Sequence, residues 1–346
     1  MKHLNSSELA LELRRESPTP RDYHFGEFYK LREIADGLET GHDAAISAPR
    51  VAVVGNCQAE SLRILLATTG AVRSFRIPPI HEWDEADLPF VRHLLADTDV
   101  LISQPVRDNY RDLPCGTDQL AQYLPPHGRV VKFPVLRFNA LNPYIAIVRS
   151  PQNPSLNPPV VPYHDLRLIA EHAQLSRSGT PDFAGALNQT VEQLASRERA
   201  HGCVSISDTL LDIPVWHTLN HPSNETLAAL ARRVLRAIDP QLAEAHKVQL
   251  PDEELLGHLQ SPIDEQAAQA LGAKVRRGEW TDNGEVIDAE EIREAQLKFY
   301  EEHPEVVQAA LNRHGELLTL LGFEVPDNPG DSLEPAVSAA PKGKRA

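Results

Sequence analysis

The chain has 346 residues and a formal net charge of −15, and no apolar run approaches the roughly 20 residues of a membrane-spanning helix. Its hydrophobic content of 41% and charged content of 24% are those of an ordinary globular protein. The acidic balance argues against nucleic acid or anionic lipid as a partner. The N-terminus lacks the apolar core of a signal peptide, which predicts a cytoplasmic location.

Helical and proline-rich patterns divide the chain into regions. Two amphipathic helices are predicted near the N-terminus, over residues 6–17 and 26–38, with a break at Pro18 and Pro20 because closely spaced prolines interrupt a helix. The predicted regions are an N-terminal helical extension (1–47), an α/β catalytic core (48–240), a C-terminal helical region (241–325) and a disordered tail (326–346).

A strand that runs into a tight turn stands near the start of the core. The small apolar residues Val51–Val54 are typical of a buried parallel strand, and Gly55 permits a turn that larger residues resist. Helical periodicity begins after Gln58. The sequence therefore places the turn at the carboxyl end of a strand and the amino end of a helix, where open α/β sheets bind ligands.

Cys57 lies in this turn, and its position predicts a reactive thiol. Unpaired N–H groups and the dipole at the amino end of a helix favour a thiolate. The alternative is a small apolar residue packed beneath the helix. Cys57 is one of three cysteines, and their odd number and wide spacing fit neither a disulfide framework nor a zinc site, so no metal is predicted.

Polar residues also follow a second core strand. Parallel strands end on one side of a sheet, so Ser103 and Gln104 are expected near Cys57. The Gln104 amide is suited to donate to an oxyanion, and the alternative is a side chain that satisfies local backbone groups. Further strands are predicted over residues 72–77, 99–104 and 129–133.

A long basic segment contains no carboxylate. None occurs between Asp118 and Asp165, although the chain has 49 acidic residues, and the segment carries Lys132 and Arg137 besides two other arginines. Such a segment suits a ligand that bears phosphate groups. The alternative is a core segment that excludes charge of either sign.

Histidines supply candidate bases. His217 and His221 are spaced like a metal pair on a helix face, but Pro214 and Pro222 argue against a continuous helix, so a loop histidine serving as a base is the better interpretation. His164 competes for the same role. A helix over 225–238, capped by the preceding serine or asparagine, follows.

Three short motifs carry a resemblance to a known family. Gly55-Asn56-Cys57-Gln58, Ser103-Gln104-Pro105 and Asn220-His221-Pro222 resemble the WcbI family of acetyltransferases in capsular polysaccharide biosynthesis, over about residues 48–240. The resemblance implies an α/β fold with a three-layer parallel-sheet core similar to SGNH/GDSL hydrolases, with helices added at both ends. It also implies a transferase that takes an acyl group from coenzyme A, as acetyl-CoA, to a sugar hydroxyl.

The resemblance also implies roles for individual residues. Cys57 would take the acyl group, His221 would act as its base, and Asn56 and Gln104 would complete an oxyanion hole; in a variant, Cys57 shapes the pocket and transfer is direct. No third member of a triad is assigned. The acceptor would be a small molecule or an oligosaccharide, and a homo-oligomer stays open. The expected cofactor-binding residues are Gly55, Gln58, Ser103, Lys132 and Arg137.

Two other classes of function fit the same sequence. One is an esterase or thioesterase on the same scaffold, and the other is a non-catalytic protein that binds CoA or a nucleotide. The chain has neither a Gly-x-Gly-x-x-Gly turn nor a Gly-x-x-x-x-Gly-Lys loop, which argues against dinucleotide oxidoreduction and P-loop hydrolysis.

Overall fold

The structure is a computed structural model that describes residues 19–29 and 47–326. The chain divides into two compact units: unit 1 holds the residues up to Phe138 together with Thr190–Gln260, and unit 2 holds Asn139–Gln189 together with the chain from Ser261 onward. One division falls within helix α7 (Phe183–His201). The predicted core 48–240 is therefore not one body, because residues 139–189 share their apolar cluster with the C-terminal helices.

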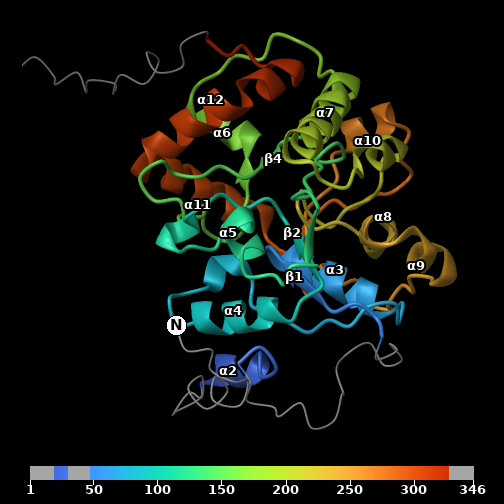
Figure 1. Cartoon of the computed structure of the whole chain (residues 1–346). Coiled ribbons are helices and arrows are strands. Elements are labelled where there is room, and N and C mark those ends of the chain that lie inside the picture. Colours follow the sequence, from blue (N-terminus) through green and yellow to red (C-terminus); the bar gives the residue numbers. More distant parts are fainter. Residues whose placement is uncertain (1–18, 30–46, 327–346) are drawn as a thin grey trace, which may run out of the picture. The chain divides into compact units, whose positions relative to one another are not determined.

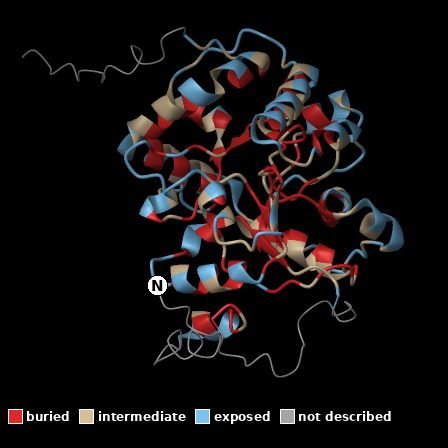
Figure 2. Cartoon of the chain, viewed as in Figure 1, coloured by how far each residue is buried: buried red, intermediate tan, exposed pale blue. Residues whose placement is uncertain are grey.

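Unit 1 is built on a parallel sheet of three strands in the order β1-β2-β3 (Figure 1). These are β1 (Val51–Val54), β2 (Val100–Ser103) and β3 (Arg129–Lys132), which confirm three of the predicted strands. Every residue of β1 and β2 is buried (Figure 2). Their near-continuous apolar sequences therefore correspond to strands covered on both faces.

The strand expected over residues 72–77 does not form. Arg73 makes a single parallel bridge with Arg50, and its carbonyl accepts the Val51 N–H at 2.8 Å. Beyond it, Phe75 and Ile77 are buried among core side chains, and residues 74–77 form no strand. Prolines at 78 and 79, which lack a donor for a ladder, end the segment.

Register places the carboxyl ends of the three strands at one level. Val54 is opposite Ser103, and Ser103 is opposite Lys132. The residues that follow β1 and β2, Gly55 and Gln104, are therefore brought to the same edge of the sheet. This is the edge at which the sequence placed the functional turn.

Two long helices pack together beside this sheet. Helix α3 (Cys57–Ala67) contacts β1 and α8 (Asn224–Ile238). Ser223 caps α8 by accepting the Thr226 N–H, as the sequence predicted. The remaining elements of unit 1 are η1 (Ile80–Glu82), α4 (Leu88–Ala96), η2 (Tyr110–Asp112), α5 (Thr117–Ala121), η3 (Ser207–Asp212), α9 (Pro240–Ala245) and β6 (Leu259–Gln260).

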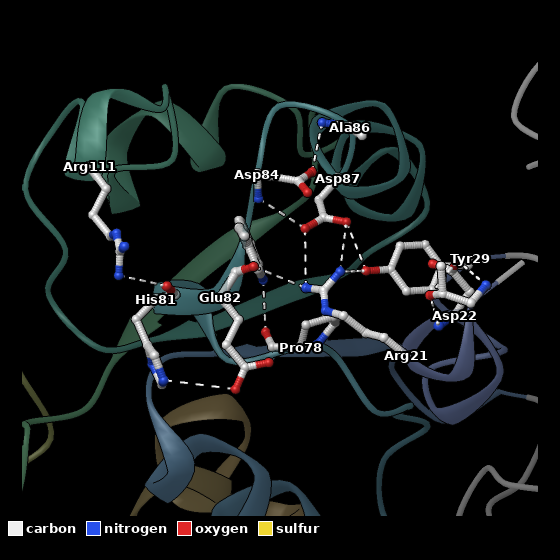
Figure 3. A network of polar contacts seen from close by, with 12 residues as sticks. Arg21, Asp22, Tyr29, Pro78, His81, Glu82, Asp84, Ala86, Asp87 and Arg111 are labelled. Carbon is white, nitrogen blue, oxygen red and sulfur yellow. Dashed lines mark hydrogen bonds and ion pairs between the residues drawn. The ribbon is translucent and has the colours of Figure 1, made fainter. Parts of the chain in front are cut away.

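A short helix, α2 (Pro20–His24), forms where a break was expected. Proline is accommodated because Pro20 occupies the first turn, where its missing N–H has no helical partner to lose, and Thr19 and Asp22 form a capping box. From α2, Arg21 reaches the buried carboxylate of Asp87 at 3.3 Å (Figure 3). The predicted helix 6–17, most of 26–38, and residues 327–346 of the predicted disordered tail lie outside the described residues.

Unit 2 combines small antiparallel strand pairs with helices. Strand β4 (Ile145–Ala146) pairs with β5 (His164–Asp165), and β7 (Trp280–Asp282) pairs with β8 (Glu285–Ile287). Its helices are α6 (Leu166–His172), α10 (Glu265–Ala270), α11 (Ala289–Glu302) and α12 (Pro304–Leu320), which bury a common apolar cluster together with the first turns of α7. Helix α12 begins at Pro304, two residues after the end of α11. No helix within the described ranges is long and apolar enough to cross a bilayer.

Candidate functional site

The turn after β1 presents Cys57 as the first residue of α3. Asn56 is the N-cap, and its side-chain oxygen accepts the Gln58 N–H at 3.0 Å. Cys57 is neither fully buried nor exposed, and it forms no disulfide. The predicted strand, turn and helix are therefore confirmed, with the thiol at the amino end of the helix.

Burial dominates the chemistry of the thiol. It raises the pKa of Cys57 above the ordinary value of 9.0, and the backbone N–H groups of Gln58 and Cys57 offset only part of that rise. The N–H groups at the helix terminus therefore favour the thiolate, as predicted, but burial outweighs them and the net shift is upward. At neutral pH the group is a thiol, so a nucleophilic role requires a base to remove its proton.

Gln104 is packed against the same turn. Its Oε1 accepts the Asn56 N–H at 2.9 Å. A Cβ added to Gly55 would lie 2.6 Å from that oxygen, closer than real contacts allow. Glycine is therefore required at 55 so that the Gln104 amide can approach the backbone of the turn.

The Gln58 side chain joins three segments beneath the turn. Its Nε2 donates to the carbonyls of Leu136 at 2.9 Å and Asn220 at 2.8 Å. Its Oε1 accepts from the Leu136 N–H at 3.0 Å and from Nε2 of Gln104 at 3.1 Å. Two donors and two acceptor positions are used, so the hydrogen-bonding capacity of this buried amide is filled by protein groups.

Several side chains that were predicted to contact a ligand form hydrogen bonds with other groups of the protein. Gln104 is 3% exposed, which matches the alternative of a side chain that satisfies nearby groups. Ser103 is fully buried, and its hydroxyl donates to the Gln104 carbonyl at 2.8 Å and lies 3.2 Å from Thr117 Oγ1. Contacts of these side chains and of Gln58 with a cofactor or an oxyanion stay predictions.

The histidine segment folds as a tight turn instead of a helix, as its prolines predicted. His217 N–H donates to the His221 carbonyl at 2.9 Å, and His221 N–H donates to Thr218 at 3.2 Å. The Asn220 carbonyl within this turn is the one that Gln58 binds. Cys57 precedes Gln58 in the sequence, and His221 follows Asn220. The bond therefore joins the turn that bears Cys57 to the turn that bears His221.

His221 is held as a neutral imidazole. It is 9% exposed, and within the described part of the chain its Nδ1 has no hydrogen-bond partner. Burial is the largest cause that lowers its pKa to about 4, and His258, whose ring centroid is 5.4 Å away, and His217 contribute to the same shift. A neutral ring with an available nitrogen is the form that a general base requires.

A carboxylate that the sequence did not identify lies beside the same turn. Glu254 Oε2 is 3.0 Å from His217 Nε2 and accepts the Asn224 N–H at 2.8 Å. Glu254 is 37 residues beyond His217 in a region of weak helical signal, so no spacing rule connects the two. Among the residues that the structure describes, no group of three His, Cys, Asp or Glu side chains could hold a metal ion.

The competing histidine lies elsewhere. His164 belongs to unit 2 and is 1% exposed, and its Nδ1 is 3.1 Å from the hydroxyl of Tyr300. Burial lowers its pKa to about 4. Asp165 caps α6 and pairs with Arg167 instead of the histidine, so these neighbours form no dyad.

The basic residues of the acid-free segment are divided between the two units. Lys132 ends β3 and pairs with Asp118 at 3.4 Å, and Arg137 is half-buried in the same unit. Arg149, in contrast, belongs to unit 2 and donates to Asn157 at 2.7 Å. The phosphate-binding role of Lys132 and Arg137 stays a prediction.

Unit 2 contains a cavity of 1210 Å³ that sequence reasoning missed. Arg167 lies over the Tyr144 ring in its wall at 4.8 Å and forms an ion pair with Asp165 at 2.7 Å. None of the site residues predicted from the sequence lines this cavity.

Comparisons with known proteins agree with the motifs. The family model described as the polysaccharide biosynthesis enzyme WcbI matches residues 50–242, more than half of the chain. A solved structure of WcbI, described as a novel polysaccharide biosynthesis enzyme, shares the fold with a TM-score of 0.64 and 17% identity, covering 80% of this chain and 98% of that one. Its description concerns native protein without a disulfide bond between CoA and one of its cysteines. No curated protein matches the sequence.

Proposed function

Because the chain belongs to the WcbI family of polysaccharide biosynthesis enzymes, we propose that it moves an acetyl or other short acyl group from coenzyme A to a sugar hydroxyl. The reaction would serve surface or capsular polysaccharide synthesis in the cytoplasm, on an SGNH-like core. CoA is proposed as the donor because the description of the WcbI structure names CoA with a cysteine. The observation that carries the proposal is the bond from Gln58 to the Asn220 carbonyl, which joins the turns bearing Cys57 and His221.

In the proposed reaction, neutral His221 removes the proton of the Cys57 thiol. The thiolate attacks the carbonyl carbon of the acyl-CoA, a new C–S bond forms, the bond to the CoA sulfur breaks, and the CoA thiolate takes the proton from His221 as it leaves. The sugar hydroxyl then attacks the acyl carbon while His221 accepts its proton, the bond from the acyl carbon to the Cys57 sulfur breaks, and His221 returns the proton to that sulfur, which restores the thiol. Backbone N–H groups at the start of α3, together with Asn56 and Gln104, are proposed to stabilise the oxyanion.

A direct transfer without the cysteine adduct uses the same residues. His221 would activate the sugar hydroxyl, and Cys57 would shape the pocket. The raised pKa of Cys57 is compatible with this route because a thiol can pack where a thiolate would be costly. The rate of acyl transfer by Cys57→Ala distinguishes the two routes. A rate near that of wild type contradicts the covalent route, and a loss of about 100-fold or more supports it.

Donor binding is the first measurement. Calorimetric titration of the full chain with CoA and acetyl-CoA should give micromolar affinity that weakens in the double variant Lys132→Ala, Arg137→Ala. Arg107→Ala, which removes an exposed arginine, is a control for non-specific charge effects. No binding at millimolar CoA would remove CoA as the donor. Rapid acyl-CoA hydrolysis without a sugar acceptor would favour a thioesterase instead.

A further inference from the structure

Glu254 is a carboxylate that contacts the histidine turn at His217. We infer that Glu254 is a positioning residue, which orients the His217 ring and, through the turn 217–221, the catalytic imidazole of His221. Its role in acyl transfer rests on the proposed function. Its carboxylate is shared between His217 Nε2 and the N–H of Asn224, the first residue of α8. The positive end of the helix dipole attracts the negative charge of a carboxylate at this place.

The backbone on both sides of Glu254 is fixed by one side chain. Asn224 donates from Nδ2 to the Glu253 carbonyl at 2.8 Å, and its Oδ1 accepts the Leu255 N–H at 3.1 Å. A Cβ added to Gly257 would lie 2.7 Å from the Glu254 Cβ and 3.6 Å from His217 Cε1. The segment 253–257 is therefore folded closely against His217.

The histidine turn transmits this position to His221. Trp216 donates from its indole to Thr226 on α8 at 3.0 Å, and His217 N–H donates to the His221 carbonyl at 2.9 Å. His217 is thus attached to α8 through its neighbour, to Glu254 through its ring and to His221 through its backbone. We therefore expect a change in the orientation of the His217 ring to shift the position of His221.

Glu254 places a carboxylate beside a turn that is surrounded by imidazole side chains. The imidazoles of His217 and His258 both influence His221. Glu254 places a negative charge against this cluster, at His217. The family match ends at residue 242, and Glu254 and His258 both lie beyond it. The contact between Glu254 and His217 therefore joins a residue outside the family match to one inside it.

A carboxylate beside one ring nitrogen fixes the tautomer of a neutral histidine. An ionised carboxylate only accepts hydrogen bonds, so neutral His217 must carry its proton on Nε2. Without Glu254 the ring could carry the proton on either nitrogen and could rotate. The expected consequence is slower catalysis with little change in donor binding, because the carboxylate acts through the histidine turn.

Three variants of the full chain test the kinetic role. Glu254→Ala should lower kcat at least about 10-fold while KM for acetyl-CoA changes less than about twofold. Glu254→Gln should recover most of the activity, because its amide oxygen can accept from the same N–H groups. Asp252→Asn, which removes an exposed charge two residues away, should match wild type.

Histidine side-chain ¹⁵N spectra test the position independently of activity. At pH 8, with His217→Gln used for assignment, wild type and Glu254→Gln should show the Nε2–H tautomer of His217, and Glu254→Ala should show a mixture. Thermal melting establishes that each variant is folded. An unchanged tautomer in folded Glu254→Ala overturns the inference, as does a kcat within twofold of Asp252→Asn. If wild type transfers no acyl group but the tautomer changes, the proposed function has failed and the positioning pair stands.

Discussion

The buried amide of Gln58 donates to the backbone carbonyl of Asn220 at 2.8 Å, across 162 residues of sequence. The same amide is held by Gln104 and by both backbone groups of Leu136. The turn that bears Cys57 therefore does not depend on its own backbone alone. The Gln58 side chain connects this turn to Leu136, which lies beyond β3, and to Asn220 in the turn before α8.

Replacing this amide by an apolar side chain of similar length should destabilise unit 1. Gln58→Met removes the donor to the buried carbonyl of Leu136 and to the half-buried carbonyl of Asn220, and each unsatisfied buried group costs about 1–3 kcal/mol. We expect the free energy of unfolding to fall by about 2–4 kcal/mol in urea denaturation. Gln122→Met, at an exposed position, should change it by less than about 0.5 kcal/mol. Equal stability of the two variants would show that the Gln58 bonds contribute nothing.

The reactivity of Cys57 should follow its burial. Because its pKa lies above 9.0, the thiolate fraction should still be rising at pH 9, and with it the rate of alkylation by iodoacetamide. Mass spectrometry after timed alkylation measures the rate at each cysteine. Cys203, whose pKa is raised to about 11, should have little thiolate at pH 9 and serves as a slowly reacting reference. A Cys57 rate that reaches its plateau below pH 8 would contradict the buried-thiol description.

Local pattern was enough to predict the elements that carry the site. Four small apolar residues before Gly55 predicted β1, and the change to helical periodicity predicted α3. Ser223 before the apolar stripe predicted the cap of α8. These features depend on residues close in sequence, where the period of side-chain burial and the chemistry of helix ends decide the structure.

Contacts between distant segments could not be predicted in the same way. Nothing near Glu254 in the sequence indicates that its carboxylate binds His217, because the contact depends on how the chain returns to the start of α8. The net upward shift of the Cys57 pKa could not be predicted because its burial is set by packing that no local pattern reveals. Pro20 was interpreted as a helix breaker although the first turn of a helix accommodates proline.

The N-terminal segment should contribute measurable stability through Arg21. Its guanidinium binds the carboxylate of Asp87, which is 0% exposed, and donates to the Glu82 carbonyl at 3.1 Å (Figure 3). Asp87 also accepts the Tyr29 hydroxyl at 2.8 Å. Arg21→Met should lower the free energy of unfolding by about 1–3 kcal/mol, since it leaves a buried carboxylate without its cation.

A double-mutant cycle isolates this pair. With Asp87→Asn the carboxylate charge is gone, so the additional cost of Arg21→Met should be smaller by about 1 kcal/mol or more. Chemical denaturation of the four proteins gives the coupling energy. Arg107→Met, at an exposed arginine, serves as the control for loss of positive charge. Additive effects of the two substitutions would show that the ion pair is not a source of stability.

Protonation of His221 should make the fold sensitive to acid. Its pKa in the folded chain is about 4, below the ordinary 6.5, so between these values the unfolded chain binds more protons than the folded chain. The free energy of unfolding is therefore lost as pH falls from about 6.5 toward about 4, by up to about 3 kcal/mol for this group. His164, with the same lowered pKa, adds a similar loss. Urea denaturation at pH 7 and pH 4.5 should show a smaller loss in His221→Gln than in wild type. His201→Gln, at an exposed histidine, should lose as much as wild type. An equal loss in all three proteins would mean that the fold does not lower the pKa of His221.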